Sequence, residues 1–395
     1  MAIGYKKRLL FLLVLVLVPY LALEAVVSAV GWFRWFGNSI LILEDAKHTI
    51  QFDPVCGYCV GPTPVRSARI TDGEIEFVGI LRGNAQGFAG WQDVSPKRDS
   101  AYPKRIAVFG DSFTDGHFLG QSWPDRAQDL TRQRREPVQF LNFAQTGAGL
   151  ANWWSIVTRL LEPRNYELDG IIFAVWETDL RRPFTMWNMP DKDEPGACMR
   201  FGRTTSWDPT TFPTTLDQAR PFLKDEERYV LPREEFESAL QGRWPASVPR
   251  HFQLVLATKV WHFFRTRLRL TPPAATPDDK QGRDRLTIDI HSYIARKKLP
   301  VLVVHIPMRE NLYAQAGSRS VHFEEIKAFA QQLNAPLLDA SDLFAGMSRR
   351  EIAGHFLPHD GHWNQKGSDR FAEFVVQHLD QLSAPAASVT VGGAR

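Results

Sequence analysis

A serine at the end of an apolar run and a histidine near the other end of the chain could do chemistry together. Gly110-Asp111-Ser112 directly follows the apolar run 106–109, which predicts a strand that stops at a sharp turn and presents Ser112. Asp360 stands two residues before His362. A serine hydroxyl becomes a nucleophile when a histidine takes its proton and a carboxylate orients that histidine. The three side chains therefore indicate a nucleophilic hydrolase or acyl transferase.

The acid of this group is the least determined of the three. Asp360 could instead cap the last helix, and His359, Asp342 or Asp339 could lie near the histidine in its place. Asp111 fits a role in organising the turn better than a role in the reaction, because aspartate is a common turn residue.

Alternating strand and helix patterns between residues 105 and 382 must position these side chains. Apolar runs predict strands, amphipathic spacing predicts helices, and repeated strand-helix-strand units imply a parallel sheet covered on both faces. Ligands of such sheets bind beyond the carboxyl ends of the strands, where Ser112 is expected. The predicted strands are 105–109, 138–143, 170–175, 301–306 and 336–339, and the predicted helices are 123–134, 151–161, 286–296, 321–333 and a closing helix that includes Phe371 and Leu382.

These motifs resemble those of the SGNH/GDSL hydrolase superfamily, in its bacterial membrane-anchored or secreted branch, over residues 105–382. Gly110-Asp111-Ser112 is similar to the first block, with the nucleophile, and 142–147 to the second, with Gly147 at the oxyanion position. Gly361-His362-Trp363-Asn364 is similar to the last block. The resemblance implies a three-layer α/β/α, flavodoxin-like fold and an oxyanion site made by the backbone amides of Ser112 and Gly147.

Two departures from the family pattern bear on function. The third block usually ends in Asn-Asp, and its asparagine donates to the oxyanion, whereas this chain has Thr178 before Asp179. A threonine hydroxyl can donate, but it is shorter. The acid usually precedes the histidine by three residues, and here Asp360 precedes His362 by two. That spacing resembles the alginate O-acetylation proteins, which share the fold and transfer acetyl groups to polysaccharide.

The N-terminus predicts a membrane helix. Lys6-Lys7-Arg8 precedes an uncharged run over 9–23, and after Glu24 the chain is apolar again to Trp32. Basic residues before an apolar stretch keep the N-terminus in the cytoplasm, and Trp32, with Phe33 and Trp35, fits an interfacial belt. We therefore expect a single-pass inner-membrane protein with its catalytic domain in the periplasm. The alternative is a signal peptide that is cleaved near 27–29.

The composition bounds the remaining possibilities. A net charge of +3 over 395 residues, with no basic groove, gives no reason to expect nucleic-acid binding. Three cysteines favour one disulfide, either Cys56 with Cys59 or one of them with Cys198. The proposed chemistry requires no metal and no cofactor.

The chain divides into five expected parts. Residues 1–36 form the membrane helix or signal segment, 37–104 a lead-in with strands near 40–43 and 75–81, and 105–382 the hydrolase-like domain. The stretch 183–285 interrupts that domain as a surface insertion or as a lid or acceptor-binding cap, with a helix over 251–270. Residues 383–395 are expected to be a disordered tail.

Three functions remain open from the sequence. The first is an extracytoplasmic serine esterase acting on acyl esters, in particular acetylated glycans. The second is an O-acetyltransferase in cell-surface polysaccharide assembly, which would work with other assembly proteins. The third is a non-catalytic glycan-binding or scaffold protein on a hydrolase fold, which the replacement at Thr178 favours and the intact Ser112 and His362 oppose.

Overall fold

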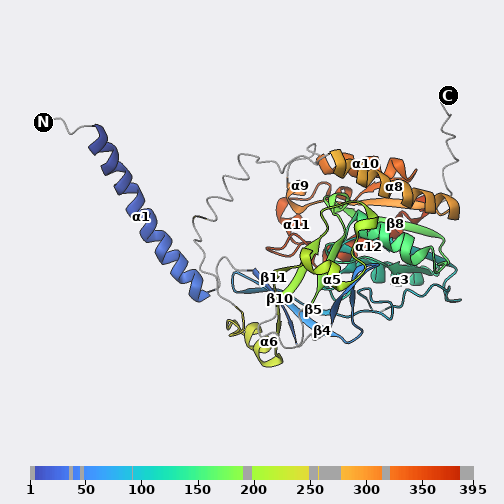
Figure 1. Cartoon of the computed structure of the whole chain (residues 1–395), viewed down its shortest axis with the longest axis horizontal. Coiled ribbons are helices and arrows are strands. Elements are labelled where there is room, and N and C mark those ends of the chain that lie inside the picture. The colour runs from blue at the N-terminus through green and yellow to red at the C-terminus, as the bar shows by residue number, and fades with distance from the viewer. Residues whose placement is uncertain are drawn as a thin grey trace.

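The computed structural model describes residues 5–34, 39–44, 49–90, 92–189, 198–248, 257, 277–313 and 321–382. Two large sheets and a two-stranded sheet lie in the body of the described chain, and a long helix α1 (Tyr5–Arg34) projects from it (Figure 1). The tail 383–395 and, apart from Ala257, the helix expected over 251–270 lie outside the described residues.

The central sheet has five parallel strands in the order β13-β12-β8-β6-β7. The parallel pairing predicted for the four main apolar runs is therefore confirmed. Its strands are β6 (Lys104–Phe109), β7 (Val138–Asn142), β8 (Gly170–Trp176), β12 (Val301–Ile306) and β13 (Leu337–Asp339). Every residue of β7 and β12 is buried, as expected of parallel strands that are covered on both faces.

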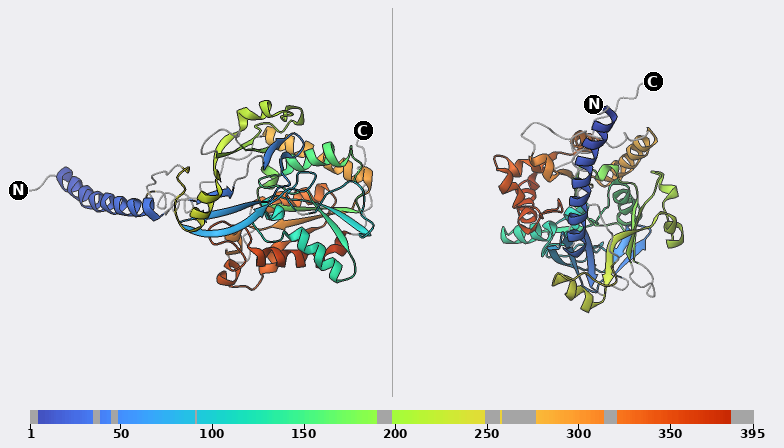
Figure 2. Two further views of the ribbon diagram at one scale, coloured as in Figure 1. Left: turned by 90° about the horizontal axis from the view of Figure 1, so that it is seen from below. Right: turned by 90° about the vertical axis from the view of Figure 1, so that its left-hand side faces the viewer.

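Helices cover both faces of this sheet, so the predicted three-layer α/β/α class is confirmed (Figure 2). One face packs against α4 (Leu150–Ile156, continued by a π-helical turn Val157–Leu161), α8 (Pro277–Lys297) and α10 (Val321–Gln332). The other packs against α3 (Trp123–Gln133) and α12 (Gln365–Gln377). The short helices are α2 (Ser112–Asp115), α5 (Leu216–Ala219), α6 (Arg233–Leu240), α9 (Arg309–Tyr313) and α11 (Arg349–Ala353).

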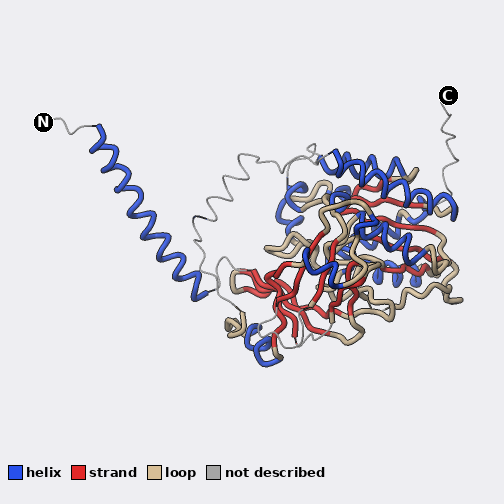
Figure 3. The backbone as a smooth tube through the Cα atoms, viewed as in Figure 1, coloured by secondary structure: helices blue, strands red, loops and turns tan. Residues whose placement is uncertain are grey.

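A second, six-stranded sheet joins two parts of the chain that are far apart in sequence. Its order is β5-β4-β1-β11-β10-β9, and only β1 and β11 pair in parallel. Strands β1 (Ser39–Glu44), β4 (Val65–Thr71) and β5 (Glu74–Leu81) precede the central sheet, whereas β9 (Thr185–Asn188), β10 (Cys198–Arg203) and β11 (Lys224–Leu231) follow β8. Figure 3 shows this sheet as a group of strands beside the central one.

One face of the six-stranded sheet is covered by α6, and the other faces the central domain. Ile40, Ile42, Ala68 and Ile70 pack against Phe236 of α6. Between the sheet and the central domain lies the hairpin of β2 (Ile50–Asp53) and β3 (Gly57–Val60), which contacts β9. The sheet therefore has a core of its own on one side and borders the loops of the central domain on the other.

The predicted disulfide is wrong. Cys56 and Cys59 carry free thiols, so none of the pairings considered from the sequence forms. Cys56 lies in the turn before β3 and is buried in the central core with Phe88, whereas Cys59 lies on β3 itself. Cys198 on β10 packs against the cluster around α6. Burial raises the pKa of the Cys59 thiol to about 11, so the thiol stays protonated at neutral pH.

Helix α1 contains one stretch that is long and apolar enough to cross a membrane, Phe11–Val30, with a mean hydropathy of 2.4. Its leucine and valine side chains are largely exposed, for example Leu13 and Val16. A long helix with exposed, mostly apolar side chains is what a bilayer accommodates. The N-terminal helix is thus a candidate membrane span.

Candidate active site

Ser112 sits in a tight turn at the carboxyl end of β6, where local contacts fix its position. Gly110 has no room for a side chain, because an added Cβ would lie 2.3 Å from Thr114 Oγ1 and 2.6 Å from Thr114 Cβ. Asp111 caps the four-residue helix α2 by accepting a hydrogen bond from the Phe113 amide at 3.0 Å. Ser112 is the first residue of that helix and is largely buried.

The structure brings Ser112 and His362 together from positions 250 residues apart in the chain. Ser112 Oγ lies 2.6 Å from His362 Nε2. His362 Nδ1 is hydrogen-bonded to Asp360 Oδ1. The His362 ring lies between two phenylalanines, with centroid distances of 4.6 Å to Phe113 and 5.0 Å to Phe118. These contacts fix the orientation of the histidine ring: Nε2 faces the serine and Nδ1 faces the carboxylate.

The carboxylate partner of His362 is Asp360, and one alternative considered from the sequence, Asp339, pairs with another histidine. Asp339 Oδ1 is 2.9 Å from His305 Nδ1. Asp360 is not a helix cap, because Asn364 caps α12 by accepting from the Gly367 amide at 3.1 Å.

The charge state of Asp360 follows from its surroundings. Burial alone would raise the pKa of its carboxyl, but the hydrogen bond and charge of His362, with the charge of Arg69, outweigh burial and hold that pKa well below its ordinary value. Asp360 is therefore a carboxylate at neutral pH. A carboxylate there accepts the Nδ1 proton, which leaves the Nε2 lone pair directed at Ser112.

Gly147 lies in a turn beside the same edge of the sheet. The Ala148 amide donates to the Gln145 carbonyl at 3.0 Å, and Gly147 has φ +77°, as position i+2 of a type II turn requires. In the described part of the chain, neither the Gly147 amide nor the Ser112 amide donates to another protein group. Two unused donors on neighbouring loops are what an oxyanion site needs.

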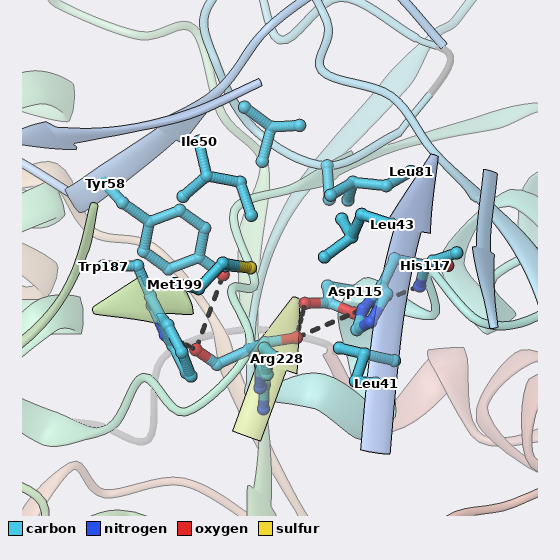
Figure 4. Close-up of a pocket in the computed structure, with 14 residues that line it drawn as sticks. Leu41, Leu43, Ile50, Tyr58, Leu81, Asp115, His117, Trp187, Met199 and Arg228 are labelled. Atoms are coloured by element: carbon cyan, nitrogen blue, oxygen red, sulfur yellow. Dashed lines mark hydrogen bonds and ion pairs between the residues drawn. The ribbon is translucent and has the colours of Figure 1, made fainter. Parts of the chain in front are cut away.

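Contacts from outside the central domain hold the loop that carries Gly147. The Thr146 carbonyl accepts from Trp187 Nε1 of β9 at 3.1 Å and from the Tyr58 hydroxyl of β3 at 3.4 Å. Thr146 Oγ1 donates to Asp115 Oδ2, and His117 Nδ1 lies 2.9 Å from Asp115 Oδ1. Figure 4 shows these groups around a cavity of about 20 Å³, which has room for about one water molecule.

Thr178 lies at the end of β8, half-buried, before a short 3₁₀ turn that begins at Asp179. Its Oγ1 accepts a long hydrogen bond, 3.4 Å, from Arg182 Nη2. The preceding residue, Glu177, is buried and accepts from Asn311 Nδ2 and, at 3.4 Å, from the Met308 amide. The Thr178 hydroxyl keeps its own proton free to donate in another direction.

Two arginines at the site were not anticipated from the sequence. Arg182 Nη1 contacts Asp111 Oδ2 at 3.0 Å, the Ala148 carbonyl at 2.9 Å and Asp179 Oδ1 at 2.8 Å. It thus joins the turns after β6, β7 and β8. Arg69 of β4 forms an ion pair with Asp360 Oδ2. An arginine in a sequence is usually interpreted as a surface residue. The acids Asp111 and Asp179 lie inside motif loops that are expected to be buried, and buried carboxylates need a cation as a partner, so these two residues were the available signal.

Metal chemistry was not expected, and that absence stays a prediction. In the ranges that the structure describes, no group of three or more histidine, cysteine or acidic side chains is arranged to hold a metal ion.

The fold and the site together define an α/β protein with serine, histidine and aspartate converging at the carboxyl edge of a parallel sheet. Residues 254–391 match the family model of the SGNH hydrolase-like domain of the acetyltransferase AlgX. That match includes Asp360 and His362, while Ser112 precedes it. The match over these residues supports a member of the SGNH/GDSL hydrolase superfamily.

The chain also matches solved structures at low sequence identity, with TM-scores below 0.5. A lipase/acylhydrolase from Enterococcus faecalis is 10% identical, with a TM-score of 0.35, over 72% of this chain and 100% of that one. A Bacillus subtilis protein is 14% identical, with a TM-score of 0.38, over 87% of this chain and 74% of that one. A lipase from a goat rumen metagenome is 13% identical, with a TM-score of 0.33, over 72% of this chain and 100% of that one. No curated protein sequence matches the chain.

Proposed function

We propose that the protein is a membrane-anchored serine esterase that hydrolyses acyl esters, in particular acetyl esters of glycans, outside the cytoplasm. The observation that carries the proposal is the contact of Ser112 Oγ with His362 Nε2 at 2.6 Å, with Asp360 on the other ring nitrogen. This geometry supports nucleophilic attack, because the base already lies within proton-transfer distance of the hydroxyl.

The reaction follows from the positions of these groups. His362 Nε2 takes the proton of Ser112 as Oγ attacks the acyl carbonyl carbon, and Asp360 stabilises the imidazolium that forms. The Ser112 and Gly147 amides hold the oxyanion, with the Thr178 hydroxyl as a third donor. The C–O bond to the alcohol then breaks, and His362 returns the proton to the leaving oxygen. Water attacks the acyl-serine in the same way, which releases the carboxylic acid and restores Ser112.

Labelling by a fluorophosphonate probe tests this proposal directly. The full-length chain in detergent micelles should be labelled at Ser112 and should release acetate and p-nitrophenol from p-nitrophenyl acetate. Ser112→Ala should lose both properties and keep its thermal unfolding midpoint, while Ser292→Ala, which changes an exposed serine on α8, should keep both. An unlabelled wild-type chain that turns over no acyl ester would leave the non-catalytic, glycan-binding alternative in place.

A second candidate is transfer of the acyl group to a polysaccharide hydroxyl. It is supported by the acetyltransferase description of the matching family and by the short spacing between Asp360 and His362. Hydrolysis and transfer share the acyl-Ser112 step and differ only in the acceptor. If transfer is the function, added oligosaccharide should speed the release of p-nitrophenol and should itself become acylated. If the protein is an esterase, the acceptor should change neither quantity, and acetylated oligosaccharides should be deacetylated.

We propose the inner membrane as the location, with the catalytic domain in the periplasm. The span Phe11–Val30 and the preceding Lys6, Lys7 and Arg8 support this orientation. After cell fractionation the chain should stay with membranes in alkaline carbonate, and protease added to spheroplasts should degrade the domain. Release of a shortened chain into the periplasm would instead indicate a cleaved signal peptide.

A further inference from the structure

The guanidinium of Arg69 reaches the acid of the triad from a different sheet. Arg69 Nη1 forms an ion pair with Asp360 Oδ2, while Asp360 Oδ1 binds His362 Nδ1. Each carboxylate oxygen therefore has its own partner. The side chain of Arg69 is 25% exposed and that of Asp360 is 9% exposed, so the pair is largely screened from solvent. An ion pair in such surroundings interacts more strongly than one on the surface.

The six-stranded sheet also binds the backbone of the loop that carries the triad acid. Glu76 of β5 accepts hydrogen bonds from the amides of His359, at 2.7 Å, and Asp360, at 2.9 Å. Phe77, which is in register with Arg69, packs against Phe118 at 5.5 Å. Phe118 in turn packs against the ring of His362. Charge, backbone hydrogen bonds and an aromatic contact thus all run from β4 and β5 to the triad.

The charge of Arg69 acts on the reaction through Asp360. A lone carboxylate beside a histidine favours the imidazolium and so raises the pH at which the neutral, basic imidazole appears. The nearby guanidinium offsets part of that effect. It also restricts rotation of the carboxylate, because both oxygens are engaged.

We propose that Arg69 is a positioning residue of the triad: it fixes Asp360 against His362 and sets the pH range in which His362 acts as a base. The inference rests on the proposed function, and it makes the six-stranded sheet part of the catalytic machinery. Several titratable or charged groups lie around the Asp360–His362 pair in the described chain. They include Arg69 on β4, Glu76 on β5, Arg228 on β11 beside Arg69 and Asp115, Arg309 beside the 357–358 carbonyls, the Asp115–His117 pair and the Asp111–Arg182 pair.

The test compares three variants of the full chain in detergent micelles. Arg69→Gln removes the charge, Arg69→Lys keeps it, and Arg66→Gln is the control. Arg66 is on the same strand, but it pairs with Glu44 and Glu237. The measurement is kcat/KM for p-nitrophenyl acetate between pH 5 and pH 9. Arg69→Gln should lower kcat/KM about tenfold. It should also shift the ascending limb of the pH profile to higher pH by about half to one pH unit, which is the size of a Coulomb interaction at this range. In Arg69→Lys the ascending limb should lie at the wild-type pH, and Arg66→Gln should leave the profile unchanged.

A second measurement does not depend on activity. The rate at which diethyl pyrocarbonate modifies His362, followed by peptide mapping, reports the fraction of neutral imidazole at each pH. The midpoint at His362 should rise in Arg69→Gln by the same amount as the kinetic limb. If the wild-type chain is inactive and this midpoint still moves, the esterase proposal fails and the inference about Arg69 stands. An active Arg69→Gln variant in which neither the limb nor the midpoint moves would overturn the inference alone.

Discussion

Arg182 Nη1 donates to Asp111 Oδ2 at 3.0 Å, and this contact ties the loop after β8 to the residue directly before Ser112. Both side chains are buried, with exposed fractions of 11% and 1%. The same guanidinium contacts Asp179 and the Ala148 carbonyl, so one positively charged group binds three loops of the site. Burial alone would lower the pKa of Arg182, but Asp179 and Asp111 outweigh burial and raise it, so the charge is permanent.

Arg182→Gln should therefore impair both stability and catalysis. It leaves two carboxyl groups buried without a cation, and breaking a buried ion pair typically costs about 3–5 kcal/mol. We expect a loss of about 3 kcal/mol in the free energy of unfolding at pH 7. We also expect a fall in kcat, because the turns after β6 and β7 lose the side chain that contacts both of them. Urea unfolding and steady-state kinetics of the same preparations would measure both.

The neighbouring Arg181 provides a matched control. Arg181 pairs with Glu325 of α10 at 2.8 and 2.9 Å, but both side chains are about 30% exposed. Surface pairs are worth about 0–1 kcal/mol, so Arg181→Gln should change stability by no more than that and should leave kcat unchanged. Equal effects of the two substitutions would contradict the role given to Arg182.

Gly147→Ala tests whether the turn conformation matters for turnover. Gly147 has φ +77°, and an added Cβ would meet only ordinary contacts, the nearest 3.5 Å away at Phe201. The cost is therefore conformational, about 1 kcal/mol for a side chain at positive φ. Gly346 has φ +76° with nothing within 4 Å of an added Cβ. Both alanine variants should lose similar stability, but only Gly147→Ala should lower kcat, by at least about tenfold. Alanine keeps the backbone amide, but relief of the positive φ would turn that amide away from the proposed oxyanion position. Equal kcat values would show that turnover does not depend on a glycine in this turn.

The central sheet was predictable because its signals are local. The strands of the parallel sheet are continuous apolar runs, and each is followed by a glycine, an asparagine or an acid within a few residues, so β6, β7, β8 and β12 were expected close to their observed bounds. The contact between Ser112 and His362 was expected for a different reason, because a nucleophilic serine requires a histidine that takes its proton. The roles of these residues in a reaction stay predictions until turnover is measured.

The six-stranded sheet was predicted only in part: the strands expected near 40–43 and 75–81 are confirmed as β1 and β5, but its other strands were not expected. Strand β11 contains Lys224, Asp225, Glu226 and Arg228 within eight residues, a composition typical of a surface loop. It becomes a strand because β1 and β10 lie on either side of it, and β1 is more than 180 residues earlier in the chain. Such pairing depends on tertiary register and not on local periodicity. Arg69 lies in this sheet, so its contact with Asp360 could not be inferred without the structure.

Thr178→Val tests the third proposed oxyanion donor. Valine has the shape of threonine without the hydroxyl. If the Thr178 hydroxyl donates to the oxyanion in the transition state, Thr178→Val should lower kcat by a factor of about 10²–10³. Thr178→Asn should keep or raise kcat, because asparagine supplies a longer donor at the same position. The control is Thr287→Val on α8, which removes a buried hydroxyl that donates to the Arg283 carbonyl at 2.9 Å. A Thr178→Val variant with wild-type kcat would show that two amides suffice.

The stability of the chain should fall at alkaline pH because of His305, which lies next to the loop that carries Thr178. His305 Nδ1 is 2.9 Å from Asp339 Oδ1, and Nε2 is 3.8 Å from Glu177 Oε1. Burial alone would lower the pKa of His305, but these two carboxylates outweigh burial and raise it above the ordinary 6.5. The protonated ring thus stabilises the folded state fully below pH 6.5, and this contribution is lost as pH rises through the raised pKa.

Urea unfolding of the full chain between pH 5 and pH 9 should show this loss in the wild type and not in His305→Asn, at about 1.4 kcal/mol per unit by which the pKa is raised. His355→Asn is the contrasting control, because burial lowers the pKa of His355 despite its hydrogen bond to the Glu351 carbonyl. Its ionisation destabilises the fold only below pH 6.5, so removing it should flatten the acidic side of the curve and leave the alkaline side as in the wild type. If His305→Asn keeps the alkaline decline, the charge at the cluster of Glu177, His305 and Asp339 is not what stabilises this end of the sheet.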